Sequence, residues 1–354
     1  SQGMSTFPFE SLRRFPDLES PELLASDAAD RLLLSELQHE VEADPSLLEA
    51  GLVVIGDNYG AITLAAIADL GFTSVRVHQD ARSGELALEN NATELSITGF
   101  TLHGLDPELV RDARIVAMRL PRSLDQLDQW SAKQYFGMVV ASLAVQKSRV
   151  LRVKEPQAEV ALEALTSWPK SKRYDVIDMT VCAHGGVFSG INLDIGTREL
   201  LAVLDQTPQD ATRIIDFGCG SGLLAVAIAR LRHAATVIAS DQSSAAVASA
   251  AATLEANGLG DRVEVVRDDG LASQPDASAD LILFNPPFHS GAAVHSDTSV
   301  RLFAEAGRVL KPGGELWVVA NSHLGYKPVL RDLVGETLEV KRTPKFTVTR
   351  SIKA

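Results

Sequence analysis

Ile-Ile-Asp-Phe-Gly-Cys-Gly-Ser-Gly, residues 214–222, is the stretch of this 354-residue chain that decides the fold. Its apolar start predicts a buried strand over Arg213–Phe217, and the apolar run after the glycines predicts a helix over Leu223–Leu231. Glycines 218, 220 and 222 permit a tight turn, let a ligand approach the backbone, and leave the helix to begin with free N–H groups. A strand, a glycine loop and a helix in this order predict a cofactor site at the carboxyl end of the strand.

Two acidic residues follow later strands of the same unit. Asp241 comes 19 residues after Gly222 and ends the next predicted strand, where a carboxylate can accept both ribose hydroxyls of a cofactor. NAD and S-adenosylmethionine (SAM) share that ribose, so Asp241 does not separate them, and a helix N-cap, for which Ser243 is equally placed, is the alternative role. Asp269 follows the predicted strand Val263–Arg267, and we expect it to meet an adenine amine, a solvated turn being the alternative.

The feature that discriminates between the cofactors is Asn285-Pro286-Pro287-Phe288, which follows the buried run Ala279–Phe284. The Asn285 carboxamide oxygen and the Pro286 carbonyl can each accept one N–H of an exocyclic amine, which aims the lone pair at a methyl donor. Phe288 offers a face for a base that has left its helix, and His289 is placed to contact the base or phosphate, or to lie at the rim. The loop spacing GxGxG also departs from the dinucleotide GxGxxG. We predict a site for SAM and a planar amine, with Asn285, Pro286 and Phe288 catalytic.

The N-terminal half reads as a second copy of this unit. Strands predicted at Gly51–Ile55, Ser74–His78 and Ile115–Leu120 alternate with predicted helices, which implies a parallel sheet. Aligning Gly60 with Gly222 places Val54 at Asp216, Asn58 at Gly220, Gln79 or Asp80 near Asp241, and Arg119-Leu120-Pro121 at Asn285-Pro286-Pro287. The copy therefore lacks the chemistry, and we expect a scaffold that helps to hold substrate, a second cofactor site being the alternative.

Charge and composition limit the class of protein. The net charge of −13 indicates an acidic enzyme, and residues 1–140 account for −12 of it, with 10 basic and 22 acidic side chains. Nucleic acid needs a basic surface. One local basic face remains, at Lys147, Arg149, Arg152, Lys154, Lys170, Lys172 and Arg173.

The two cysteines, Cys182 and Cys219, are too few for a disulfide framework or a zinc site, so we expect no metal. No apolar run approaches the roughly 20 residues that span a bilayer, and no secretion pattern is present, so we expect a cytoplasmic protein.

Several further elements are predicted along the chain. We expect helices over residues 5–50, with Ser26-Asp27 capping one of them, and over Trp130–Val145. A β-hairpin is expected over Tyr174–Ala183 and Gly186–Phe188, followed by a helix that Asp194 or Thr197 caps. The basic residues near 168–173 either line a groove at the domain boundary or form a solvated linker. We place a degenerate domain at 5–160 and a catalytic domain at 174–354, which ends in the antiparallel hairpin of a seven-stranded methyltransferase sheet.

These motifs resemble the bacterial ribosomal RNA guanine-N2 methyltransferases, the family that holds the small-subunit methyltransferase C and the large-subunit methyltransferase G. The resemblance covers almost the whole chain and rests on Gly186-Val187-Phe188-Ser189, Leu193-Asp194-Ile195-Gly196, residues 216–222, Asn285-Pro286-Pro287-Phe288-His289 and Val319-Ala320-Asn321. It implies an α/β protein with two tandem class I (Rossmann-like) SAM-methyltransferase domains, the first degenerate. It also implies N2 methylation of a guanine in ribosomal RNA, with SAM contacts from Asp216, Phe217, Gly218, Cys219, Gly220, Gly222, Asp241, Asp269 and Asn285.

The expected substrate is 23S ribosomal RNA, because Ser11–Pro16, Ala28–Asp30 and Leu120–Leu124 look more like the large-subunit enzymes. We expect RNA contacts from Phe188, Phe288, His289, Lys170, Lys172 and Arg173, and a monomeric protein. The alternatives are guanine-N2 methylation of 16S RNA, methylation of adenine N6 or a protein glutamine, and a ribosome-assembly factor without catalysis. The duplicated architecture argues against the adenine and glutamine substrates. The intact Asp216, Gly218, Gly220, Asp241 and Asn285 argue against loss of catalysis.

Overall fold

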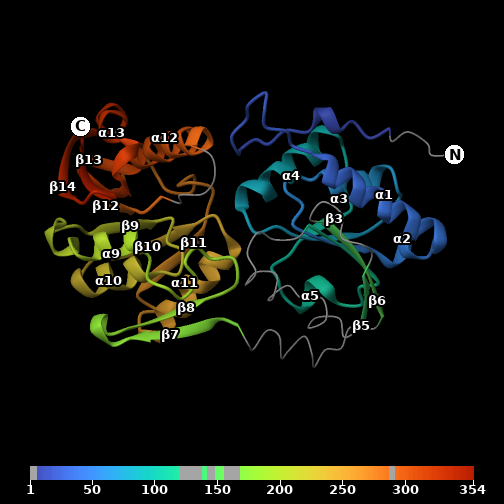
Figure 1. Cartoon of the computed structure of the whole chain (residues 1–354), viewed down its shortest axis with the longest axis horizontal. Helices are drawn as coiled ribbons and strands as arrows, with labels where there is room; N and C mark the ends of the chain where they lie inside the picture. Colours follow the sequence, from blue (N-terminus) through green and yellow to red (C-terminus); the bar gives the residue numbers. More distant parts are fainter. Residues whose placement is uncertain (1–5, 120–137, 142–147, 155–167, 287–291) are drawn as a thin grey trace. The chain divides into compact units, whose positions relative to one another are not determined.

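The computed structural model describes residues 6–119, 138–141, 148–154, 168–286 and 292–354 (Figure 1). The chain divides into two compact units, Ser1–Trp168 and Pro169–Ala354. Each unit carries its own largely parallel sheet with helices packed on it, which confirms the predicted α/β class and the tandem arrangement.

The sheet of the C-terminal unit has seven strands in the order β11-β10-β9-β12-β13-β15-β14. The first five of that order are mutually parallel, and β15 pairs antiparallel with both β13 and β14. The strands are β9 (Arg213–Phe217), β10 (Thr236–Asp241), β11 (Val263–Arg267), β12 (Ala279–Phe284), β13 (Leu310–Asn321), β14 (Gly335–Arg342) and β15 (Phe346–Lys353). The predicted C-terminal hairpin is thus confirmed, and it completes the seven-stranded sheet.

Helices cover both faces of this sheet, which explains why its central strands are continuously apolar. On β9, Ile214 packs in the cluster formed with α10 and α11, whereas Ile215 packs on the opposite side against Phe303 of α12. Figure 1 shows α9, α10 and α11 on one side of the strands and α12 and α13 on the other. The helices are α9 (Ile195–Leu201), α10 (Leu223–Leu231), α11 (Ser244–Ala256), α12 (Ala292–Val309) and α13 (Lys327–Leu333).

A two-stranded hairpin of β7 (Lys170–Tyr174) and β8 (Met179–Ala183) is fastened to the side of α11. Along β8, the backbone N–H groups of residues 180, 182 and 184 donate to side chains at 257, 253 and 249 of the α11 segment, at 2.8–2.9 Å. The hairpin was predicted one strand too late, since Gly186–Phe188 is not a strand and the basic stretch before Tyr174 is one. The reason is that β7 is an exposed edge, which tolerates lysines, so its sequence reads as a loop.

The sheet of the N-terminal unit has the order β3-β2-β1-β4-β6-β5, with the first four strands parallel and β6 antiparallel to both β4 and β5. Its strands are β1 (Leu52–Ile55), β2 (Val75–His78), β3 (Phe100–Leu102), β4 (Ile115–Arg119), β5 (Met138–Ala141) and β6 (Ser148–Lys154). The helices among the described residues of this unit are α1 (Ala28–Ala43), α2 (Leu47–Ala50), α3 (Ala61–Ala68), α4 (Arg82–Glu94) and α5 (Pro107–Val110). The central order 3-2-1-4 is the same in both units, which is the physical counterpart of the sequence repeat.

Two predictions for this unit are wrong. Residues 6–27 were expected to be helical, but the 3-10 turn at Phe9–Ser11 is the only helical element that the structure forms there. Leu12 and the two phenylalanines at 7 and 9 pack into the core from an irregular segment, so burial rather than helical periodicity explains the apolar spacing there. The predicted helix Trp130–Val145 contains strand β5, whose β-branched valines pair with β6, and the rest of that range lies outside the described residues.

Candidate active site

The predicted site residues follow four neighbouring strands that end at the same level. Phe217 pairs with Ser240 on one side and with Phe284 on the other, and Asp241 pairs with Arg267. The glycine loop, Asp241, the Asp268-Asp269 pair and Asn285 therefore leave the sheet at one edge, with adjacent strands about 4.8 Å apart. The chain order reverses at β9, between β10 and β12, which is where open α/β sheets bind ligands.

The glycine loop after β9 has the conformation that its sequence predicts. Gly218, Gly220 and Gly222 have φ of 68°, 51° and 88°, and a Cβ added to Gly220 would meet nothing within 4 Å. At Gly222 the backbone packs so closely on α11 that an added Cβ would lie 3.0 Å from Cα of Ala250. The loop thus needs glycine at 222 for packing on α11, and at 220 it leaves space beside the backbone.

Phe217, at the end of β9, and Cys219, in the loop, direct their side chains into the protein. The Phe217 ring stacks on Phe284 with centroids 4.6 Å apart, and Cys219 is 8% exposed. The Cys219 N–H donates to the carbonyl of Ser240 at 2.9 Å, which fixes the loop against the end of β10. Any contact of Phe217 or Cys219 with a cofactor therefore involves their backbone.

Asp216 is the buried acid beneath this loop. Its side chain is 1% exposed, it accepts the backbone N–H of Ala225 in the first turn of α10, and its Oδ2 has no hydrogen-bond partner among the described residues. Burial, together with the charge of Asp241, raises the pKa of Asp216 to about 7, against the opposing effect of the Ala225 N–H. A buried carboxylate oxygen of this kind fits a cationic ligand, because a positive charge would offset its desolvation.

Asp241 links the loop to the following helix. Its Oδ2 accepts the N–H of Gly220 at 3.0 Å and its Oδ1 accepts the N–H of Ser243 at 3.0 Å. The helix cap itself is Ser243, whose hydroxyl accepts the N–H of Ala246 at 3.1 Å. The N-cap alternative for Asp241 is therefore wrong, and the carboxylate instead joins the glycine loop to the turn before α11.

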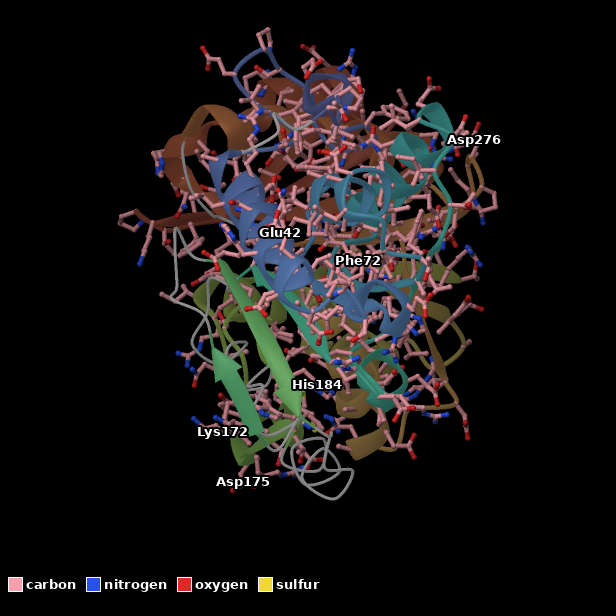
Figure 2. The ribbon with its side chains drawn as sticks, turned by 90° about the vertical axis from the view of Figure 1, so that its right-hand side faces the viewer. Glu42, Phe72, Lys172, Asp175, His184 and Asp276 are labelled. Carbon is pink, nitrogen blue, oxygen red and sulfur yellow. The ribbon has the colours of Figure 1, made fainter. Side chains whose placement is uncertain are left out.

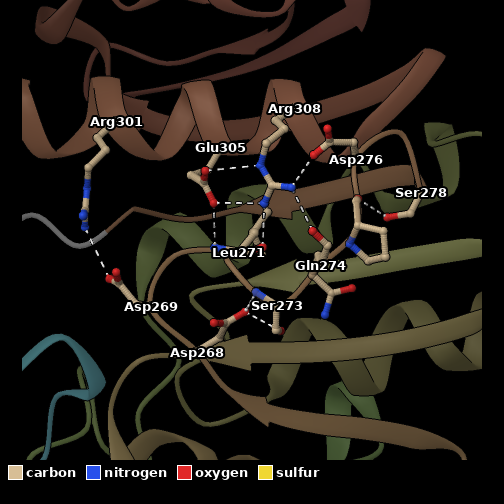
Figure 3. Close-up of polar contacts among 11 residues, drawn as sticks. Asp268, Asp269, Leu271, Ser273, Gln274, Asp276, Ser278, Arg301, Glu305 and Arg308 are labelled. Carbon is tan, nitrogen blue, oxygen red and sulfur yellow. Dashed lines mark hydrogen bonds and ion pairs between the residues drawn. The ribbon is translucent and has the colours of Figure 1, made fainter. Parts of the chain in front are cut away.

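The two acids after β11 are distinct in role (Figure 3). Asp268 is 7% exposed and its Oδ2 accepts both the N–H and the hydroxyl of Ser273, so it stabilises the turn. Asp269 faces Arg301 on α12 at 3.6 Å. Glu305 and Arg308, also on α12, bond the same 268–278 loop, Glu305 through the Leu271 N–H. Helix α12 thus holds the loop that presents Asp269.

Asn285 is held by the N-terminus of α9. Its Nδ2 donates to Oδ2 of Asp194 and to Oγ1 of Thr197, each at 3.2 Å, and its buried Oδ1 has no hydrogen-bond partner among the described residues. A Cβ added to Gly196 would lie 2.8 Å from that Oδ1. Pro286 is buried next to it. Pro287, Phe288 and His289 lie outside the described residues, so their predicted roles stay predictions.

The predicted RNA-contact residues in and after the hairpin are exposed, and Figure 2 labels Lys172 among them. Lys170, Lys172 and Arg173 lie on β7, and Phe188 is 46% exposed in the loop before α9. Lys172 lies over the Tyr174 ring at 4.9 Å, and Arg173 pairs with Asp175 and Asp178 at the hairpin turn. The turn acids offset part of the basic charge, so the net positive charge of this edge comes chiefly from the lysines.

The N-terminal unit has the same backbone plan, but the hydrogen bonds between its loop and the second strand run in the opposite direction. Gln79, at the position of Asp241, donates from Nε2 to the carbonyls of Asp57 and Asn58 at 2.6 and 3.1 Å, whereas Asp241 accepts from its loop. Asp57, which is 1% exposed, accepts the N–H groups of Ile62 and Thr63 at the start of α3. The sequence comparison missed Asp57, because this acid comes from the loop and not from the strand. The polar groups of this loop are thus hydrogen-bonded to neighbours within the unit, which argues against a second cofactor site.

Among the described residues, no group of three or more His, Cys, Asp and Glu side chains is arranged to hold a metal ion. Every helix in the part of the chain that the structure describes is too short or too polar to cross a bilayer.

Asp216→Asn is expected to change the pH dependence of stability. Burial raises the pKa of Asp216 from its ordinary value of 3.8 to about 7, so the folded state binds more protons between those values and wild-type stability falls as pH rises. The amide does not titrate, so the mutant should gain stability relative to wild type by up to about 1.4 kcal/mol per pH unit between pH 5 and 7. Urea unfolding of both proteins without ligand at pH 5, 6, 7 and 8 measures this, and a difference independent of pH would contradict it.

Both halves of the chain are similar in sequence to known protein families. Residues 178–350 match the methyltransferase small domain and residues 4–132 match the RLMG N-terminal domain. The ribosomal RNA large subunit methyltransferase G of Streptomyces coelicolor is 35% identical over 97% of both chains, and that of Ectopseudomonas mendocina is 35% identical over 98% of this chain and 99% of its own. In fold, the chain is similar to the T. thermophilus 16S rRNA N2 G1207 methyltransferase, solved with AdoMet and guanosine. The TM-score is 0.63 at 22% identity, covering 93% of this chain and 92% of that one. The chain therefore belongs to the ribosomal RNA large subunit methyltransferase G family.

Proposed function

We propose that this protein transfers a methyl group from SAM to the exocyclic N2 amine of a guanine in 23S ribosomal RNA. The observation that carries the proposal is Asn285, which presents a carboxamide oxygen beside the glycine loop at the switch point of the sheet. We infer the RNA substrate from the relatives, because their names describe large-subunit ribosomal RNA methyltransferases. We place the reaction in the bacterial cytoplasm and assign the degenerate N-terminal domain a scaffold role in holding RNA.

The residues of the site fit SAM. When bound, SAM supplies an electrophilic methyl group on a sulfonium. Asp216 offers the buried oxygen that suits a positive charge, Asp241 offers acceptors for the ribose hydroxyls, and Asp269 offers an acceptor for the adenine amine. The loop at Gly220 lets the ligand lie against the backbone.

Asn285 acts on the guanine. Its Oδ1 accepts one N–H of the N2 amine and the Pro286 carbonyl accepts the other, which orients a lone pair that is otherwise delocalised into the ring. The new N–C bond forms as the C–S bond breaks, and the methylated amine then loses a proton to water. No strong general base is needed, because the methylated cation is strongly acidic.

Methyl transfer from radiolabelled SAM to unmodified 16S and 23S RNA, each also as its ribosomal subunit, tests the proposal. Nucleoside analysis should find the label in N2-methylguanosine of 23S RNA. Label in 16S RNA would move the substrate to the small subunit, and label in N6-methyladenosine would correct the base. Absence of label from every RNA would overturn the proposal and direct the search to protein substrates or a non-catalytic role.

Charge reversal of β7 tests the RNA face. Lys170→Glu with Lys172→Glu is expected to weaken binding of 23S RNA roughly tenfold at low salt, and by less at high salt, because each phosphate contact releases counterions. Filter binding at several salt concentrations measures this. Lys327→Glu with Arg331→Glu, a pair of basic residues on α13 that changes the net charge by the same amount, is the control for net charge alone. Unchanged affinity at low salt would place the RNA face elsewhere.

A further inference from the structure

The contact between Asn285 and α9 joins residues 91 positions apart in the chain. Asp194 is the N-cap of α9, and its Oδ1 accepts the Thr197 N–H at 3.1 Å while its Oδ2 accepts from Asn285. Both acceptors of the Asn285 amide nitrogen therefore belong to the first turn of one helix. Thr197 is 8% exposed, so solvent hardly competes for its hydroxyl.

The N-terminal unit contains the same connection with a different side chain. Strand register makes Arg119 the counterpart of Asn285, since Met118 pairs with Ile55 as Phe284 pairs with Phe217. Arg119 bonds Asp27, the N-cap of α1, and Asp30, the third helical residue, at 2.9 and 2.6 Å. In both units, therefore, the N-cap and the third residue of a helix that precedes the first strand, α1 or α9, hold the residue at the end of the fourth strand. Arginine has no acceptor, and only the asparagine version leaves an oxygen to bind an amine.

We propose that Asp194, Thr197 and Gly196 are positioning residues that fix which end of the Asn285 carboxamide faces the substrate. This rests on the proposed function. A carboxylate can only accept a hydrogen bond, so the amide nitrogen must face Asp194 and the oxygen must face away. Gly196 leaves room for the whole carboxamide beside α9, because a Cβ there would lie 2.8 Å from Oδ1, 3.1 Å from Nδ2 and 3.2 Å from Cγ of Asn285. The site thereby selects a substrate group that donates, an amine, and rejects a carbonyl in the same place.

Asp194→Asn separates the positioning role from the helix cap. Asparagine caps helices as well as aspartate, so α9 should remain intact. Its Oδ1 would still accept the Thr197 N–H, but its Nδ2 would meet the Asn285 Nδ2, donor against donor. Asn285 must then turn over or move away, and the substrate amine loses its acceptor. The expected result is a fall in kcat of about 100-fold, by analogy with the loss of one oriented hydrogen-bonding group, with SAM affinity within about threefold of wild type.

Asp106→Asn is the matched control, because Asp106 caps α5 by accepting the Leu109 N–H at 3.2 Å and has no role in the site. It should leave kcat unchanged. In an Asn285→Ala background, Asp194→Asn should lower kcat no further, since it acts through Asn285. Thr197→Val should lower kcat and Thr197→Ser should restore it, because serine keeps the hydroxyl.

Gly196→Ala supplies a second test that does not depend on charge. Alanine is the better helix former, which offsets part of the cost of displacing the Asn285 side chain, so the melting temperature should change little while kcat falls at least tenfold. If the wild type transfers methyl groups and both Asp194→Asn and Gly196→Ala keep wild-type kcat, the positioning role is overturned and the proposed function stands. Additive effects of Asp194→Asn and Asn285→Ala would also overturn it, because they would show that Asp194 acts independently. If the wild type itself transfers no methyl group to any RNA, the proposed function fails first.

Discussion

Asn285→Ala is expected to lower kcat for methyl transfer about 1,000-fold while SAM affinity changes less than threefold. The carboxamide oxygen is an acceptor that the substrate amine needs in the transition state, and removal of one such oriented group typically costs 100- to 1,000-fold. The Asn285 side chain has its nitrogen bonded to α9 and its oxygen buried, so alanine would leave Asp194 and Thr197 without their donor. Those two residues and water can then reorganise, but they cannot replace the acceptor.

Single-turnover kinetics with 23S RNA and calorimetric titration with SAM measure the two quantities separately. Asn90→Ala, an exposed asparagine on α4, serves as the matched control and should keep wild-type kcat. A mutant whose kcat for methyl transfer is within tenfold of the wild-type value would contradict the assigned role of Asn285. A mutant that loses SAM affinity to the same degree as kcat would show instead that Asn285 supports the cofactor.

Asp241→Ala is expected to weaken SAM binding about 100-fold. The carboxylate accepts the Gly220 and Ser243 N–H groups and, in the proposed complex, the ribose hydroxyls. Hydrogen bonds to a charged group contribute about 1.5–3 kcal/mol each. Loss of two such bonds to the ribose therefore lowers the affinity for SAM by at least about 100-fold. The loop also loses its tether to β10, which lowers the preorganisation of the site.

Calorimetric titration with SAM, and thermal unfolding of the free protein, test this change. Asp261→Ala, an exposed aspartate in the same unit, is the control and should bind SAM as wild type does. Affinity within threefold of wild type would show that the ribose is bound elsewhere. A large drop in melting temperature without SAM would assign the effect to the tether between Asp241 and the loop.

The repeated cap contact also explains how one fold can carry an active and a degenerate unit. In the N-terminal unit Arg119 forms ion pairs with Asp27 and Asp30, and burial raises the pKa of Asp30 to about 6 despite the arginine. That contact can only join the helix to the sheet, since the guanidinium has no acceptor. In the C-terminal unit the same contact is made by an amide, which joins the helix to the sheet and leaves one oxygen that can accept the substrate amine in the proposed reaction.

Much of this protein could be predicted from sequence because its signals are local. The glycine loop after β9 and the apolar runs of β9, β10 and β12 lie within the lengths over which periodicity and turn chemistry operate, and their order implies a parallel sheet. The edge strand β7 and the irregular segment before α1 were predicted incorrectly, because an exposed edge and a buried loop lack those local signals. The family resemblance followed from the same short motifs.

The sequence by itself determined the fold class and the duplicated plan, and it predicts the glycine loop, Asp241 and Asn285 as site residues. Only the tertiary structure decided what those residues contact. It separated Ser243 as the helix cap from Asp241 as the loop acceptor, assigned Asp268 to the turn, and joined Asp194 and Thr197 to Asn285. Such contacts link positions tens of residues apart, and the direction in which a side chain donates or accepts depends on neighbours that only packing brings together.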